Sequence, residues 1–195
     1  MNAVGTQKRY RDTELVERVI SGDRAAFDAL TQRYLDKCYR IARRLGLSPE
    51  DAVDVVQDTF VAAYQNIERF DFAFQFSTWI TRILLNRISN MRRGLRRARR
   101  LFFRSSWQQW EGFLANARSA DDPQRDFEQA ELREHLQKAI DQLPEPQKTV
   151  LVLFDIEGFK AREIAVMLDI PEGTVTSRLH HARKRLRKLL HDYLS

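Results

Sequence analysis

Apolar side chains recur every three or four residues along most of the chain, and this spacing constrains the fold more than any other feature. It is the spacing of one buried face of an α-helix. It is clearest in the second predicted helix, whose apolar positions are Phe27, Leu30, Tyr34, Cys38, Ile41 and Leu45. The strict alternation of apolar and polar residues that would indicate a strand does not appear. The sequence therefore predicts an all-α fold.

Capping residues and breaks divide the first hundred residues into four predicted helices. Asp12 is expected to cap the first helix and Ser48 the third, because short polar side chains accept hydrogen bonds from free N–H groups there. An aromatic-rich break over residues 69–76 ends the third helix. Ser77 or Thr78 is the expected cap of the fourth. Residues 1–100 are thus predicted to form one helical domain.

The periodicity is lost over residues 101–126, which we interpret as a linker. This segment contains Trp107 and Trp110, so its aromatic side chains either dock on a partner or pack on the first domain. A second helical domain is predicted over residues 127–195. Its expected parts are a periodic stretch to residue 143, a helix over 146–156, a short helix over 161–168, a turn over 169–173 and a final helix.

The charge balance favours a polyanionic partner without requiring one. The chain has 33 Lys and Arg against 27 Asp and Glu, a net charge of +6, and a basic surface alone would also explain this excess. The single cysteine, Cys38, excludes an internal disulfide and a cysteine-rich zinc site. The N-terminus lacks the apolar core of a signal peptide, and the longest aliphatic run is too short to cross a bilayer. A cytoplasmic protein without membrane insertion is therefore expected.

The C-terminal residues carry the clearest motif, a helix-turn-helix. A short helix, a tight turn and a second helix rich in hydroxyl and basic groups match this motif, whose second helix enters the DNA major groove. Thr174 or a neighbour is expected to cap that helix, whose free N–H groups could hold a phosphate. The candidate duplex-binding residues are Thr174, Thr176, Ser177, Arg178, His180, His181, Arg183 and Lys184. A solvated helix hairpin is the alternative.

Two further clusters have both a functional and a structural explanation. Seven arginines lie between residues 92 and 104, and they could bind a polyanion or simply form a solvent-exposed helix face. The aromatic side chains of the break before them could stack on unpaired bases. At least half of those aromatic rings are expected to be core. The acidic residues Glu50, Asp51, Asp54 and Asp58 gain from the dipole of the third helix. Because carboxylates repel phosphate, they are also a candidate docking face for a basic protein.

These residues resemble a known family. Residues 51–60 closely resemble the polymerase-binding helix of bacterial sigma factors, and residues 76–80 with Ile83 and Asn86 resemble their promoter-melting segment. Residues 143–145, 163–165, 170–175 and 177–179 resemble their C-terminal domain. The order and separation of the two blocks are similar to those of the extracytoplasmic-function (ECF) subfamily of the sigma-70 family.

The resemblance implies a division of labour and no enzymatic activity, cofactor or metal. The coiled coil of the largest subunit of core RNA polymerase would bind Asp51, Asp54, Gln57 and Asp58. The minus-10 element of promoter DNA, with one base flipped into the loop, would contact Phe70, Asp71, Phe72, Phe74, Gln75, Trp79, Arg82, Asn86 and Arg93. The last helix would read the minus-35 element. The polymerase flap and an anti-sigma factor are the other implied partners.

Two residues depart from the family pattern. Thr176 and His181 stand where the family often has Lys or Arg, and neither can make the bidentate contact of a guanidinium with guanine. The docking of the last helix is therefore expected, but not its base preference. We hypothesise that His180 and His181 contact bases or phosphate.

Three other functions fit parts of the sequence. A helix-turn-helix regulator that is not a polymerase subunit would leave the acidic helix and the aromatic loop without a role. A nuclease would need a carboxylate or histidine cluster, whereas the four histidines lack metal-ligand spacing. A pure interaction protein, such as an anti-sigma factor, would not need the basic face of the last helix.

Overall fold

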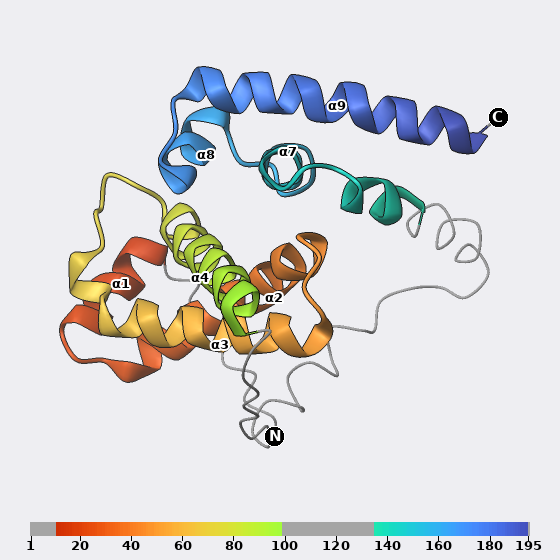
Figure 1. Cartoon of the computed structure of the whole chain (residues 1–195). Coiled ribbons are helices and arrows are strands. Elements are labelled where there is room, and N and C mark those ends of the chain that lie inside the picture. The colour runs from red at the N-terminus through yellow and green to blue at the C-terminus, as the bar shows by residue number, and fades with distance from the viewer. Residues whose placement is uncertain (1–10, 99–134, 195) are drawn as a thin grey trace, which may run out of the picture.

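The computed structural model describes residues 11–98 and 135–194, and these residues contain helices and no strands (Figure 1). The first range, here called the N-terminal group, contains α1 (Asp12–Ile20), α2 (Arg24–Arg44), α3 (Pro49–Gln65), the 3-10 turn η1 (Ile67–Arg69) and α4 (Phe76–Ala98). The second, the C-terminal group, contains a helical stretch over 135–141, α7 (Glu145–Leu151), the π-helical turn η3 (Val152–Ile156), α8 (Ala161–Leu168) and α9 (Glu172–Leu194). The all-α prediction is confirmed. The predicted linker, with Trp107 and Trp110, lies outside the described residues.

Local sequence signals account for most helix boundaries of the N-terminal group. The Ser48 side chain accepts a hydrogen bond from the Asp51 N–H at 3.0 Å, and Pro49 follows it in the first turn of α3. The Asp23 side chain caps α2 in the same way through the Ala26 N–H. Gly46 follows the end of α2 with a φ of +91°, a conformation that side-chain-bearing residues rarely adopt.

Three predicted caps are wrong. Asp12 is the first residue of α1 rather than its cap, and its carboxylate accepts hydrogen bonds from Arg33 and Tyr34 of α2. Ser77 and Thr78 lie inside the first turn of α4. There the Gln75 carbonyl accepts hydrogen bonds from the Thr78 and Trp79 N–H groups, so the helix starts at Phe76, two or three residues before a start capped by Ser77 or Thr78.

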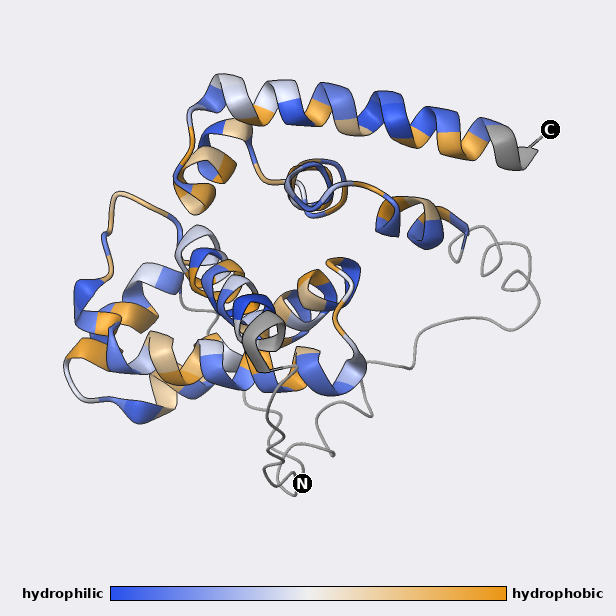
Figure 2. Ribbon diagram, in the orientation of Figure 1, coloured by the Kyte–Doolittle hydropathy of each residue, from blue (hydrophilic) through white to orange (hydrophobic). Residues whose placement is uncertain are grey.

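The core of the N-terminal group is built from the predicted stripes, and Figure 2 shows apolar residues recurring between hydrophilic ones along its helices. Its fully or nearly fully buried side chains include Leu15, Val16, Leu30, Ile41, Ala52, Val56, Phe60, Ile80, Leu84 and Ile88. Full burial of one large aliphatic side chain contributes about 1.5–3 kcal/mol. Cys38 is buried as well, and desolvation raises the pKa of its thiol to about 12, which keeps it protonated and unreactive.

The C-terminal group holds the predicted helix-turn-helix. Asp169 ends α8 in the left-handed region with a φ of 53°, and the chain turns into α9. Val175, Leu179 and Ala182 of α9 are buried with Ile164 and Met167 of α8, which fixes the angle of the hairpin. Because the Pro171 carbonyl accepts from the Thr174 and Val175 N–H groups, α9 starts at Glu172 and Thr174 is not its cap. The helix predicted over 146–156 has the expected extent, but its last five residues form the π turn η3.

The two groups pack on each other. In Figure 1 α8 lies over the first turns of α4, and the two helices are in contact. α2 contacts η3. None of the helices within 11–98 and 135–194 combines the length and apolar character that a membrane crossing needs.

Candidate functional site

The acidic residues of α3 share one exposed strip. Asp54 and Asp58 are exposed one turn apart, and Asp51 and Gln57 are half-buried beside them. Partial burial raises the pKa of Asp54, and the neighbouring carboxylates of Asp51 and Asp58 raise it further. A surface where like charges are held together is stabilised when a cationic partner binds it.

An apolar hollow of about 430 Å³ adjoins this strip. It lies between α2 and α3, and Gln57 belongs to both the strip and the hollow. Val61 and Tyr64 line it and expose large parts of their side chains, and the Tyr64 ring meets the edge of the Phe27 ring at 5.0 Å. Sequence reasoning missed these residues. The available signal was that apolar Val61 and Tyr64 lie four and seven residues after Gln57, on its face of the helix rather than on the core stripe.

The aromatic loop between η1 and α4 has a buried base and an exposed tip. Phe70 is only 5% exposed and contacts the rings of Phe72, Phe76 and Trp79 at centroid distances of 5.0–6.0 Å. Phe72 and Phe74 are 48% and 39% exposed. The expectation that the Phe70 ring itself contacts a base is therefore not supported, because that ring is part of the core. Asp71, predicted as a DNA contact, accepts a hydrogen bond from the Ala73 N–H at 2.9 Å and shapes the turn.

A second hollow, of about 400 Å³, lies between the end of α3 and α4. Its walls bring together the predicted DNA contacts Trp79 and Asn86 with Ile83, which belongs to the segment that resembles the promoter-melting segment. The other lining residues were not predicted as contacts, namely Ala62, Asn66, Arg69, Arg87 and Asn90. Side-chain amides, guanidinium groups and one indole ring can hold a planar group that has both hydrogen-bond donors and acceptors. Gln75 at the start of α4 and Arg82 and Arg93 along it are exposed, and the Arg93 guanidinium donates to Asn90 Oδ1 at 2.6 Å.

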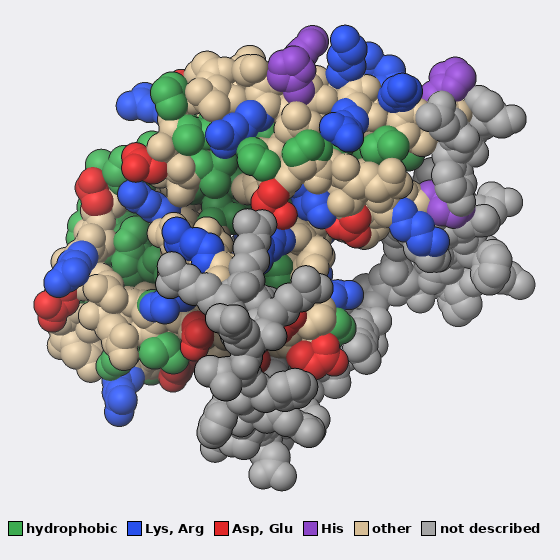
Figure 3. Space-filling model, in the orientation of Figure 1, with side chains coloured by type: hydrophobic (Ala, Val, Ile, Leu, Met, Phe, Trp, Pro, Cys, Tyr) green, Lys and Arg blue, Asp and Glu red, His purple; other side chains and the backbone are tan. Residues whose placement is uncertain are grey.

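The predicted duplex-reading residues fall mainly on the outer side of α9. Figure 3 shows basic and histidine side chains gathered along this helix. The exposed residues are Thr176, Ser177, His180, His181, Arg183 and Lys184, whereas Thr174 and Arg178 are half-buried. Arg183 also has partners within the protein. Its guanidinium forms a bidentate ion pair with Asp155 of η3 and lies 5.5 Å from the centroid of the Phe154 ring. The Arg183 guanidinium therefore already has an anionic partner within the protein.

Comparisons with known proteins match both groups. The family model for sigma-70 region 2 matches residues 30–99, and that for sigma-70 region 4 matches residues 133–186. The ECF RNA polymerase sigma-E factor of Haemophilus influenzae is 34% identical over 92% of this chain and 95% of its own length. The chain belongs to the ECF sigma factors. It is therefore a non-catalytic subunit that directs RNA polymerase to initiate transcription at particular promoters.

Other relatives agree with this assignment. The ECF sigma factor SigW of Bacillus subtilis is 33% identical over 91% of the sigma factor described here and 95% of its own length. The solved structure of CnrH with the cytosolic domain of CnrY has a TM-score of 0.66 and 28% identity, and covers 93% of this chain and 97% of that one. The structure of the sigma factor RpoE of Bartonella quintana with the anti-sigma factor NepR has a TM-score of 0.61 and 25% identity. It covers 85% of this chain and 96% of that one.

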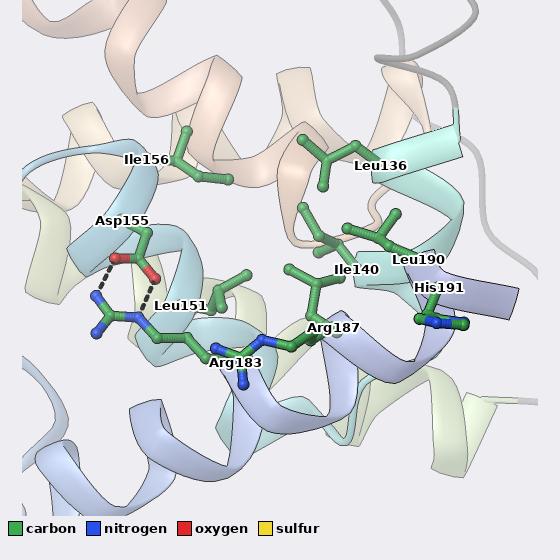
Figure 4. Close-up of a pocket in the computed structure, with 10 residues that line it drawn as sticks. Leu136, Ile140, Leu151, Asp155, Ile156, Arg183, Arg187, Leu190 and His191 are labelled. Atoms are coloured by element: carbon green, nitrogen blue, oxygen red, sulfur yellow. Dashed lines mark hydrogen bonds and ion pairs between the residues drawn. The ribbon is translucent and has the colours of Figure 1, made fainter. Parts of the chain in front are cut away.

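A further hollow, of about 590 Å³, lies in the C-terminal group of the sigma factor (Figure 4). It lies beside the second half of α9, and its apolar walls come from Leu136, Ile140, Leu151, Ile156, Leu186 and Leu190. Arg183, Arg187 and His191 supply a basic rim. Figure 4 shows the Arg183–Asp155 ion pair at one end and His191 at the other. An apolar hollow with a basic rim fits an amphipathic helix that carries acidic residues.

Proposed function

We propose that the two groups of the sigma factor recognise two different promoter elements. Residues 1–100 would bind core polymerase and the minus-10 element, residues 127–195 would read the minus-35 element, and residues 101–126 would link them. One observation carries this proposal. The N-terminal group has a hollow lined by amide, guanidinium and indole groups, whereas α9 projects its polar side chains outward.

Core polymerase would dock on α3. Asp51, Asp54, Gln57 and Asp58 would contact basic residues of the coiled coil of its largest subunit, in line with the raised pKa of Asp54. The neighbouring hollow at Val61 and Tyr64 would accept an apolar side chain from the same coiled coil. Apolar anchors in a pocket usually contribute more binding energy than exposed charge pairs do.

The hollow between α3 and α4 would hold an unpaired base of the minus-10 non-template strand. Extruding a base costs a few kcal/mol, and stacking on an aromatic side chain returns about 1–3 kcal/mol per base. Trp79 offers such a ring and Asn86 offers hydrogen bonds, while Arg82 and Arg93 would contact the backbone. Phe72, Phe74 and Gln75 would meet bases at the exposed loop, and Phe70 would hold that loop in place.

The early turns of α9 would enter the major groove at the minus-35 element. Thr176, Ser177, His180 and His181 would face the bases, and Lys184 would contact phosphate. Arg183 would orient α9 through Asp155 rather than read a base.

Two further protein partners follow from the chemistry of the C-terminal group and from the solved relatives. The hollow at Leu136 and Leu190, with its basic rim, would receive the polymerase flap. The solved structures of CnrH and RpoE each contain a second protein, the cytosolic domain of CnrY and the anti-sigma factor NepR respectively. An anti-sigma factor is therefore the expected regulator here. Because polymerase and the chromosome are its partners, the sigma factor would act in the cytoplasm.

Run-off transcription from genomic fragments with core polymerase tests the proposal. We expect specific transcripts that depend on the sigma factor, and a loss of transcription with the Asp54→Asn/Asp58→Asn variant. Glu68→Gln is the matched control, because Glu68 is an exposed carboxylate of η1 outside the acidic strip. Tight duplex binding without any dependence of transcription on the protein would instead favour a regulator that is not a polymerase subunit.

A further inference from the structure

The first three turns of α9, residues 172–182, expose no lysine or arginine side chain. Arg178 is half-buried, and the exposed basic side chains of the helix begin only at Arg183. Guanidinium and ammonium groups are the commonest readers of guanine, because they donate hydrogen bonds to its O6 and N7 atoms. The part of α9 that is proposed to face the bases therefore has to read them with other groups.

Thr176 lies in the middle of this stretch, and its hydroxyl is already bonded within the helix. The hydroxyl donates to the backbone carbonyl of Glu172, one turn earlier, at 3.2 Å. Because a threonine hydroxyl has a single hydrogen, this bond leaves no donor for DNA. The side chain is nevertheless exposed. Thr176 can therefore offer a base its methyl group and the remaining acceptor capacity of its oxygen.

The neighbours of Thr176 on its side of α9 disfavour guanine as well. Residues three and four apart share a helix face, so Glu172, Gly173 and His180 adjoin Thr176. The exposed carboxylate of Glu172 repels the acceptor atoms of guanine. His180 can donate a hydrogen bond, but it lies one helical turn of about 5.4 Å further on, which exceeds the ~3.4 Å step between base pairs and suits a neighbouring pair.

Gly173 leaves room for DNA to come close to Thr176. A Cβ added at Gly173 would meet no atom of the described chain within 4 Å, and this glycine is not among those with a positive φ. Neither packing nor backbone geometry therefore requires glycine there, although glycine is less stable than alanine in a helix. Methyl groups touch at about 4 Å, so the missing side chain one turn before Thr176 favours such a close contact.

These features fit a T·A pair better than the other base pairs. In the major groove a T·A pair presents the C5 methyl group and O4 of thymine and the amino group and N7 of adenine. The Thr176 methyl group can pack on the thymine methyl group, and its oxygen can accept a hydrogen bond from the adenine amino group. Guanine finds no donor at Thr176, and cytosine lacks the methyl group.

We propose that Thr176 is a specificity-determining residue of the sigma factor, which selects a T·A pair of the minus-35 element through contact between its methyl group and that of thymine. The inference rests on the proposed function, since it takes α9 as the reader of this element. It adds the base preference, which the proposed function leaves open. Burial of one methyl group corresponds to about a threefold to fourfold change in affinity.

Uracil in place of thymine tests the contact, because the two bases differ only in the C5 methyl group. A minus-35 duplex is taken from a promoter that the holoenzyme transcribes, and each thymine of either strand is replaced singly by deoxyuridine. At one position the replacement should weaken holoenzyme binding about threefold to fourfold in electrophoretic mobility shifts at fixed salt. Replacing the same T·A pair by G·C should weaken binding about fivefold or more.

Two variants assign this effect to Thr176. Thr176→Ser keeps the hydroxyl and removes the methyl group, so it should bind the thymine duplex about threefold to fourfold more weakly and should not respond to deoxyuridine at that position. Thr176→Val keeps a methyl group and removes the hydroxyl, so it should still respond. Thr13→Ser makes the same change at an exposed position of α1 and should behave as wild type. Circular dichroism establishes that all variants are folded.

Two results overturn the inference. Either no thymine of the minus-35 duplex responds to deoxyuridine with the wild-type protein, or every response persists in Thr176→Ser. Both results leave the proposed function standing, because it requires only that the holoenzyme binds and transcribes the promoter. Absence of transcription that depends on the sigma factor, with active core polymerase, defeats the proposed function and the inference with it.

Discussion

α4 and α9 have the same length, 23 residues each, and both present basic side chains to the outside, yet their surroundings differ. α4 packs against α2, α3 and α8, so its apolar stripe is covered and the polar side chains of Thr78 and Thr81 are buried as well. α9 packs against α7 and α8, and Leu186, Leu189 and Leu190 in its second half are only partly buried. One helix is enclosed, whereas the other lies along the edge of its group.

The difference matches the two ways of reading DNA that we propose for these helices. The polar side of α4 borders a hollow with Trp79 and Asn86 in its wall, a shape suited to a base that has left the duplex. The polar side of α9 is exposed, as suits a helix that enters the major groove. Substitutions on α4 should therefore often change both stability and DNA binding, while those on the outer side of α9 should change DNA binding alone.

The largest expected effect separates the two helices by stability. Leu84→Ala removes a fully buried side chain from α4 and should lower the free energy of unfolding by about 2–5 kcal/mol. Leu189→Ala, at a half-buried position of α9, should lower it by less than about 1 kcal/mol. Urea unfolding followed by circular dichroism measures both. Equal losses would mean that the second half of α9 is packed as tightly as α4.

The next prediction concerns the hollow beside α4. Asn86→Ala should weaken binding of holoenzyme to a single-stranded minus-10 oligonucleotide by about 1–1.5 kcal/mol, because the amide would hydrogen-bond the base. Ser89→Ala is the matched control, an exposed position of the same helix outside the hollow. Fluorescence anisotropy with labelled oligonucleotide measures both affinities. Similar losses for the two variants would place the base elsewhere.

The same contrast explains which features could be predicted from the sequence. Periodicity identified the enclosed helices, because a buried stripe such as Ile80, Leu84 and Ile88 repeats at helical spacing. It also placed Asn86 and His180 on outer faces. Local signals failed where a distant residue supplies the partner. Asp12 binds α2 instead of capping α1, and Arg183 forms an ion pair with Asp155, 28 residues away, that its own helix does not indicate.

The exposed apolar face at Val61 and Tyr64 left a sequence signal, but the hollows themselves could not be predicted because each is built by two or more elements. Asn66 follows α3 and joins Asn86 of α4 only after the chain turns through the aromatic loop. Phe70 and Phe72 are two residues apart, yet one is buried and the other exposed, and no composition rule separates them. The docking of the C-terminal group depends on Arg44 meeting Glu157 across 113 residues. No local sequence signal indicates a contact at that separation.

A smaller effect is expected on the open side of α9. His181→Ala should weaken holoenzyme binding to minus-35 duplex by about 1 kcal/mol, because one hydrogen bond to a base or phosphate is lost, and should leave the unfolding free energy unchanged. Electrophoretic mobility shifts at fixed salt give the affinity, and the same assay on mutated duplexes gives the sequence preference. An unchanged affinity and preference would remove His181 from the set of DNA contacts.

The smallest expected effect concerns the ion pair that ties α9 to η3. Asp155→Asn should cost at most about 1 kcal/mol of stability, because the Asp155 and Arg183 side chains are 32% and 49% exposed and solvent screens their attraction. The hydrogen bonds from Arg183 to Asp155 raise the pKa of the guanidinium above its ordinary value. Since the folded state holds this proton more tightly than the unfolded state, the stabilisation is fully present below the ordinary arginine pKa and disappears only in strong alkali. Arg183 therefore gives no pH dependence near neutrality, but the difference between wild type and variant should shrink as salt is added. If Asp155→Asn also reduces minus-35 binding, the ion pair orients α9 for the major groove. DNA binding by α9 would then depend on contacts with the rest of the C-terminal group, although the helix lies at the edge of that group.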